Sequence, residues 1–160
     1  MKKRLLVMSA ILAYTTTAAA AATTINGASA LALAGVVGAK SPALSSNDKH
    51  ILAHLFDGDL TVSYPANQKI SVNADSVVCR TSNVDITDRS CALIFGTHHR
   101  SVKGRKANEL NATAIQAGVP SQGAAGTIYE GFTHLACFID PNEIKQKAGG
   151  GATCTFDPGP

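Results

Sequence analysis

Four cysteines place the strongest constraint on the fold of this 160-residue chain: Cys79, Cys91, Cys137 and Cys154. An even number of cysteines in an exported protein favours a disulfide framework. Three pairings are possible, and we expect the sequential one, Cys79–Cys91 and Cys137–Cys154, because it closes the shortest loops. A loop of about 15 residues closed in this way stabilises a fold by roughly 3 kcal/mol. Zinc sites usually place paired cysteines about two to four residues apart, so the wider spacing here argues against zinc.

The N-terminus has the three-part order of a secretory signal peptide. It begins with three basic residues, Lys2, Lys3 and Arg4. An apolar run at 5–14 and an alanine run at 18–22 follow, and the alanines offer small-residue cleavage sites. The apolar run is shorter than the roughly 20 residues that span a membrane. We therefore predict a bacterial-type signal peptide over 1–22, a periplasmic or secreted location, and no transmembrane segment after cleavage.

The net charge of the chain comes from this leader. The full sequence carries 14 Lys and Arg against 11 Asp and Glu, a formal net charge of +3. Removal of the three leader cations leaves a formally neutral protein. A neutral protein lacks the basic surplus that is typical of nucleic-acid binding, so we expect no nucleic-acid partner.

The segment 23–45 consists mostly of Ala, Gly, Ser and Thr. Such a composition buries little apolar surface, so it predicts a flexible linker ahead of a folded domain at 46–160. The segment includes a weakly apolar stretch at 31–39. An uncleaved signal anchor that joins this stretch to the leader is the alternative, although threonines at 15–17 interrupt the apolar character between them.

The pattern of 46–160 predicts short helices and short strands. We expect helices at 47–56, at 105–117 and directly after Asp140, where Asp, Pro and Glu follow the order of a helix N-terminus. We expect strands at 60–64, 70–74, 77–79, 91–95, 133–139 and 153–156, and a Gly-rich connector at 118–126. The apolar strand 133–139 is expected at the centre of the sheet. The predicted fold class is α+β: a small, mostly antiparallel sheet with two or three short helices on one face and two disulfides.

The segment 98–106 holds two histidines and four fixed positive charges. We predict a basic loop that leads into the N-terminus of the helix at 105–117, where the helix dipole is already positive. Basic side chains and helix N-termini both bind phosphate or carboxylate. The candidate anion-binding residues are His98, His99, Arg100, Lys103, Arg105 and Lys106. A solvated basic loop without a ligand is the alternative.

His50 and His54 are four residues apart on the first predicted helix, which places both rings on one side. Two imidazoles at this spacing suit a divalent metal, for which Asp48, Asp57 or the histidines at 98–99 are candidate third ligands. The sequence lacks the Glu that would follow His50 in the HExxH pattern of metalloproteases. Two histidines that flank the apolar stripe and contact water are the alternative interpretation.

The sequence contains no assembled catalytic set. There is no GxSxG motif to expose a serine nucleophile, and oxidised cysteines supply no thiolate. His134 could act as a general base beside Glu130 or Asp140, and a core or edge histidine is the alternative. We therefore expect no cofactor and favour a protein that is not an enzyme.

These observations favour a small exported binding protein of the cell envelope, whose partner is another envelope protein or an anionic ligand bound by 98–106. The cysteine count and the element order resemble secreted protease inhibitors of the subtilisin-inhibitor type. The second candidate function is inhibition of an enzyme by a rigid loop that a disulfide closes. The candidate inhibitory loop is 84–90, because a loop closed by Cys79–Cys91 is partly ordered before binding. The third candidate function is that of a small metal-binding protein or hydrolase that uses the histidines.

Overall fold

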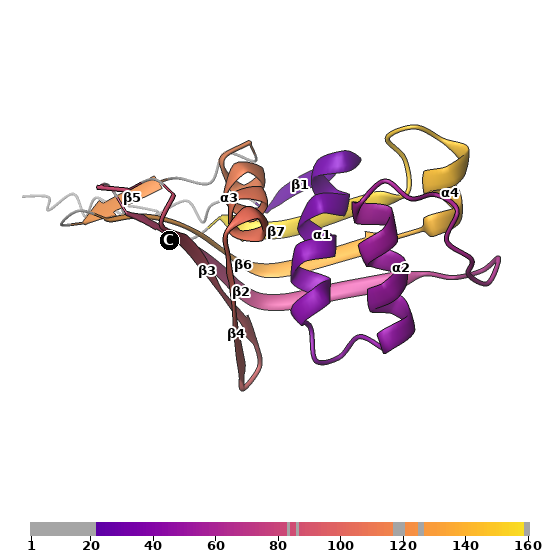
Figure 1. The fold of residues 1–160 in the computed structure, drawn as a ribbon, viewed down its shortest axis with the longest axis horizontal. Coiled ribbons are helices and arrows are strands. Elements are labelled where there is room, and N and C mark those ends of the chain that lie inside the picture. The colour runs from indigo at the N-terminus through magenta and orange to yellow at the C-terminus, as the bar shows by residue number, and fades with distance from the viewer. Residues whose placement is uncertain (1–21, 83, 86, 117–120, 125–126, 159–160) are drawn as a thin grey trace, which may run out of the picture.

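The computed structural model describes residues 22–82, 84–85, 87–116, 121–124 and 127–158 (Figure 1). The elements are β1 (Thr23–Asn26), α1 (Ala28–Lys40), α2 (Ser46–Phe56), β2 (Ile70–Ser82), β3 (Arg89–Phe95), β4 (His98–Lys103), α3 (Arg105–Gln116), β5 (Ser121–Ala124), β6 (Thr127–Ile139), α4 (Pro141–Gln146) and β7 (Ala152–Pro158). The predicted signal peptide at 1–22 lies, apart from Ala22, outside the described residues.

The described strands form one antiparallel sheet in the order β1-β7-β6-β2-β3-β4, and β5 pairs with β6 off this path. Together with the helices and two disulfides, this sheet confirms the predicted α+β class. The longest pairing joins β2 to β6 from Ile70↔Ile139 to Ser82↔Thr127. The prediction that 133–139 lies inside the sheet is also confirmed, because β6 is flanked by β7 and β2.

One face of the sheet is covered by helices and the other is open. Along β2, buried Val72, Val77 and Cys79 alternate with exposed Ser71 and Val78, as expected of a strand with one covered face. Figure 1 shows α1 and α2 side by side across this sheet, with α3 beside α1. Buried side chains from α1, α2, α3 and the sheet form a single hydrophobic core.

The prediction of a flexible linker at 23–45 is wrong. Residues 23–26 form β1, which pairs with β7, and α1 follows it with Leu33, Val36 and Val37 almost fully buried. Because α1 is apolar on most sides, it lacks the polar stripe that marks a surface helix in a sequence. Its small residues serve close packing: a Cβ atom at Gly38 would lie 2.7 Å from Leu52 Cδ1 of α2.

The predicted helix at 47–56 is confirmed as α2, with Ser45 as its N-cap. The Ser45 hydroxyl accepts a hydrogen bond from Asp48 N at 3.1 Å, one residue earlier than the sequence suggests. The short helix after Asp140 is confirmed as α4. The Asp140 carboxylate accepts hydrogen bonds from Asn142 N and Glu143 N, so it caps the helix as its sequence indicates.

The predicted strand at 60–64 is wrong, because this segment crosses toward α4 instead of joining the sheet. The Tyr64 hydroxyl donates to the Pro141 carbonyl at 2.7 Å, and Lys145 lies 4.3 Å from the centre of the Tyr64 ring. The strands predicted at 70–74 and 77–79 are one continuous strand, β2. Part of the predicted connector at 118–126 is strand β5.

The predicted disulfide pairing is confirmed. Cys79 pairs with Cys91 across β2 and β3, and Cys137 pairs with Cys154 across β6 and β7. All four side chains are buried on the helix-covered face. Since β2 and β6 are the central pair, each disulfide joins one central strand to its outer neighbour.

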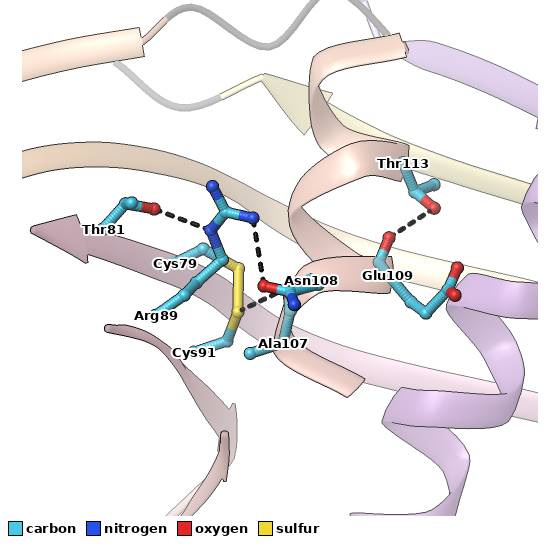
Figure 2. Close-up of a disulfide and its surroundings, with 8 residues drawn as sticks. All are labelled: Cys79, Thr81, Arg89, Cys91, Ala107, Asn108, Glu109 and Thr113. Atoms are coloured by element: carbon cyan, nitrogen blue, oxygen red, sulfur yellow. Dashed lines mark hydrogen bonds between the residues drawn. A yellow bond between two sulfur atoms is a disulfide. The ribbon is translucent and has the colours of Figure 1, made fainter. Parts of the chain in front are cut away.

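The first disulfide packs beneath the N-terminal half of α3 (Figure 2). Cys91 Sγ lies 3.6 Å from the Ala107 carbonyl oxygen. Beside it, Arg89 donates through Nε to Thr81 Oγ1 at 2.8 Å and through Nη1 to Asn108 Oδ1 at 3.1 Å. Arg89 therefore joins β3 to both β2 and α3, so the β2–β3 hairpin and the start of α3 are held in one position.

Candidate functional site: the basic edge

The predicted basic loop at 98–106 is instead an edge strand followed by the first turn of a helix. Residues from His98 to Lys103 form β4, in register with β3 from Phe95↔His98 to Ser90↔Lys103. Gly96 and Gly104, at φ values of 58° and 63°, turn the chain at either end of β4. The repeated basic residues conceal the strand pattern, because only Val102 of β4 is buried. We call His98, His99, Arg100, Lys103, Arg105 and Lys106 the basic edge.

The alternation of β4 divides these residues between two faces. Val102 is paired with buried Cys91, so Arg100 and His98, two and four residues earlier, project toward the helix-covered side. His99 and Lys103 project toward the open face. All four are exposed. The structure therefore does not bring them into one pocket but arranges them as a strip along the end of the sheet.

Arg105 and Lys106 extend this strip into the first turn of α3, where both are exposed. They also line a hollow of about 150 Å³ against α1 and α2, together with Phe56 and Asp57. A second hollow of about 370 Å³ shares Phe56 and Arg105 and includes Glu109. The carboxylates of Asp57 and Glu109 offset the positive charge here, so the strand residues of the basic edge offer the better contact for an anion.

The basic edge is not neutralised by ion pairs within the described part of the chain. The contacts of this kind there are the Lys69–Asp140 ion pair and the hydrogen bond between His54 and Asp59, and neither includes a residue of the basic edge. Arg100 donates through Nη1 to the His99 carbonyl oxygen at 3.1 Å. Its guanidinium keeps its remaining donors for solvent or a partner, since Arg has five N–H groups.

His50 and His54 lie together on α2, as their spacing predicts. Their ring centroids are 4.3 Å apart, with an interplanar angle of 65°. His54 Nδ1 lies 2.7 Å from Asp59 Oδ2. The predicted third ligands do not join them: within the described ranges no group of three or more His, Cys, Asp and Glu side chains is placed to hold a metal. Asp48 instead accepts a hydrogen bond from Gln68 at 2.7 Å.

Asp59 is a residue that the sequence interpretation missed. Its Oδ1 accepts hydrogen bonds from Thr61 Oγ1 at 2.6 Å and from Thr61 N at 2.9 Å, while Oδ2 faces His54. These contacts, those of Thr61 first and then that of His54, lower the pKa of Asp59 from 3.8 to about 2. The Asp-x-Thr order at 59–61 is a signal of such a turn in sequence.

His134 lies at a bulge of β6 with a positive φ of 54°. It is exposed, so it is not a core histidine. The carboxylate of Asp140, one of its predicted partners, pairs with Lys69 and caps α4. This engagement, with the hydrogen bond to Lys69 as its main cause, lowers the pKa of Asp140. The other predicted partner, Glu130, has a side chain outside the described part of the structure.

The candidate inhibitory loop at 84–90 includes the first two residues of β3, Arg89 and Ser90, which pair with Thr81 and Arg80 of β2. Its apolar residue Val84 is 94% exposed. Ser82 Oγ accepts from Val84 N at 3.2 Å, and Asp85 Oδ1 accepts from Thr87 Oγ1 at 2.6 Å and Thr87 N at 2.9 Å. The contacts with Thr87 lower the pKa of Asp85. Residue 86 of this loop lies outside the described residues.

Comparisons with known proteins identify no relative. No family model matches the sequence, and no curated protein and no solved structure matches the chain significantly. No helix among the described residues is long and apolar enough to cross a membrane. Any functional conclusion therefore rests on the geometry of the chain itself.

Proposed function

We propose that this protein is an exported binding protein of the cell envelope that recognises an anionic partner through the basic edge. The observation that carries the proposal is the position of these residues. They occupy a terminal strand of the sheet and the adjoining helix turn, exposed and without ion pairs in the described part of the chain. The rest of the domain balances their charge, so the basic edge is a local feature and not a property of the whole surface.

The shape of the basic edge favours an extended partner over a single small anion. A strand rises about 3.3 Å per residue, so β4 from His98 to Lys103 is roughly 17 Å long. Its basic side chains lie along that length and on both faces. One phosphate could contact only part of this strip, whereas an acidic protein segment or another polyanionic chain could follow it.

Two features support export to a periplasmic or secreted location. Both pairs of cysteines are disulfide-bonded, and disulfides form and persist in oxidising compartments. In addition, β1 begins at Thr23, so cleavage after Ala22 would remove no element of the described fold. Cleavage at the proposed position would therefore leave the described core intact.

The test compares two variants that lose the same charge. One replaces Arg100, Lys103, Arg105 and Lys106 with Gln. The control replaces Lys40, Lys49, Lys145 and Lys147, which lie on α1, on α2 and in or next to α4, with Gln. Binding to polyglutamate and to a sulfated polysaccharide is measured at low and physiological salt, with circular dichroism to verify folding.

We expect the basic-edge variant to lose binding and the control variant to bind like the wild type. Because each phosphate-like contact releases a counterion, the salt dependence of binding should also become shallower in the basic-edge variant alone. Equal losses in the two variants would show that net charge is responsible, and the proposal would be abandoned. Preference for one of the two probes would separate an acidic protein from an envelope polymer as the partner class.

A second candidate function, inhibition of a protease, rests on Val84. An exposed apolar side chain on a loop closed by a disulfide resembles a preordered binding loop, whose ordering cost is largely met before association. The test is stoichiometric titration of serine proteases with the oxidised protein, followed by mass analysis of the loop. Loss of inhibition in Val84→Asp would support the candidate, and rapid cleavage without inhibition would eliminate it.

A further inference from the structure

We propose that His50 and His54 form a two-imidazole surface site for a divalent transition metal of the copper–nickel–zinc group. The two imidazoles supply the metal ligands, and Asp59 orients one of them. This site is separate from the basic edge, and it does not depend on the proposed function. The rings lie at successive turns of one face of α2, with centroids 4.3 Å apart.

The contact between His54 and Asp59 determines which nitrogen of His54 faces a metal. Nδ1 of His54 is 2.7 Å from Asp59 Oδ2, so this nitrogen donates to the carboxylate. A proton on Nδ1 leaves Nε2 as the unprotonated nitrogen with a free lone pair. Metal-binding histidines commonly donate their second ring N–H to a carboxylate in this way, which fixes the tautomer and makes the ligating nitrogen more basic.

Asp59 is itself held in place. Both the backbone N–H and the hydroxyl of Thr61 donate to its Oδ1, which leaves Oδ2 directed at His54. The backbone adds a further connection, because Asp59 N donates to the His54 carbonyl at 2.8 Å. Besides its contact with His54, Asp59 is therefore positioned by three hydrogen bonds within residues 54–61, and the whole site is built from the continuous segment 50–61.

The exposure of the site suits a metal that keeps water ligands. His50 is exposed and His54 is 37% exposed at its side chain. The exposed ring of His50 can adjust toward the metal, and open coordination positions remain for solvent. Two imidazoles with water favour Cu²⁺ over Ni²⁺ and Zn²⁺, following the general order of stability, and they disfavour Ca²⁺ and Mg²⁺, which prefer oxygen ligands.

The experiment is calorimetric titration of the oxidised protein with CuCl₂, and then with ZnCl₂ and CaCl₂. Electron paramagnetic resonance of the copper complex identifies nitrogen ligands. We expect one high-affinity Cu²⁺ per chain with imidazole coordination, weaker Zn²⁺ binding and no Ca²⁺ binding. Asp59→Asn should weaken Cu²⁺ binding by about 10- to 100-fold while the copper signal retains its nitrogen ligands.

His50→Ala is the direct test, since this exposed residue can be removed without loss of the fold. It should abolish two-imidazole coordination, whereas the matched control His134→Asn, at another exposed histidine, should leave titration and spectrum unchanged. Asn suits the positive φ at 134, so the control should fold. Unchanged copper coordination in His50→Ala, or an equal loss in His134→Asn, would overturn the assignment. An unchanged affinity in Asp59→Asn would overturn the orienting role of the carboxylate.

Discussion

Cys79 and Cys91 lie directly opposite each other on the antiparallel strands β2 and β3, with Cα atoms 4.0 Å apart and their sulfurs bonded. Cys137 and Cys154 stand in the same relation on β6 and β7. Replacing either pair with alanine should lower the free energy of unfolding by about 3 kcal/mol, because the unfolded chain regains loop freedom.

Removal of either disulfide should lower the free energy of unfolding by nearly the same amount. Their sequence separations of 12 and 17 differ so little that loop entropy distinguishes them by only about 0.3 kcal/mol. Denaturant unfolding of Cys79→Ala/Cys91→Ala and Cys137→Ala/Cys154→Ala measures both values. A loss below about 1 kcal/mol in either would mean that the reduced chain already holds those strands together.

Gly38 should resist replacement although it lies in a helix. Alanine normally favours a helix over glycine by about 1 kcal/mol. At this position its Cβ would lie 2.7 Å from Leu52 Cδ1, so Gly38→Ala should instead destabilise the fold by about 1–3 kcal/mol through overpacking between α1 and α2. Thermal or denaturant unfolding provides the measurement.

A double-mutant cycle with Leu52 tests whether this contact causes the destabilisation by Gly38→Ala. Leu52→Val removes the clashing atom, so the cost of Gly38→Ala should shrink in that background. If the cost is unchanged, contact with Leu52 is not what requires a glycine in α1.

Ionisation of Asp59 should make the free energy of unfolding depend on pH in the acid range. Its folded-state pKa of about 2 lies below the ordinary 3.8, so its hydrogen bonds stabilise the native state above about pH 4. This contribution should be lost as the pH falls from 4 toward 2. Melting temperatures of the wild type and Asp59→Asn should therefore differ near pH 5 and converge near pH 2. Carbon NMR of the Asp59 carboxyl checks the pKa directly, and a midpoint near 3.8 would contradict the prediction.

His134 should accept glycine without loss of stability. A residue with a side chain at a φ of 54° carries a conformational cost that glycine avoids. That gain should offset the greater freedom of glycine in the unfolded chain, so His134→Gly should change stability by less than about 0.5 kcal/mol. The neighbouring Ala136→Gly, on an exposed position of the same strand, should cost about 1 kcal/mol. Equal costs in the two variants would show that the bulge imposes no strain.

The sequence predicts the elements that have local signals better than those that depend on tertiary packing. The disulfide pairing follows from cysteine spacing, and α2 and α4 follow from their capping residues, because these signals act over a few residues. Helix α1 is not predicted because its buried residues are, apart from Leu33, all Ala, Gly and Val, a composition shared with linkers. Its packing against α2, α3 and the sheet distinguishes it from a linker, and that packing is tertiary structure.

The candidate sites show the same division. The side-by-side placement of His50 and His54 follows from helical spacing. The sequence also predicts a turn at 59–61, but it does not predict that the Asp59 carboxylate faces His54. Charge alone identifies the basic segment at 98–106, yet its pairing with β3 depends on residues three to thirteen positions earlier in the hairpin. Pairing with β3 therefore decides which of these side chains share a face.

The pairing of β1 with β7 has a consequence for the order of events in folding. Thr23 lies opposite Phe156, so β1, the first of the described strands, can pair only after β7, the last of them, has been synthesised. Contacts between such distant positions slow folding. The ribosome must therefore complete β7 before β1 can dock, and until then β1 has no partner strand in the described sheet.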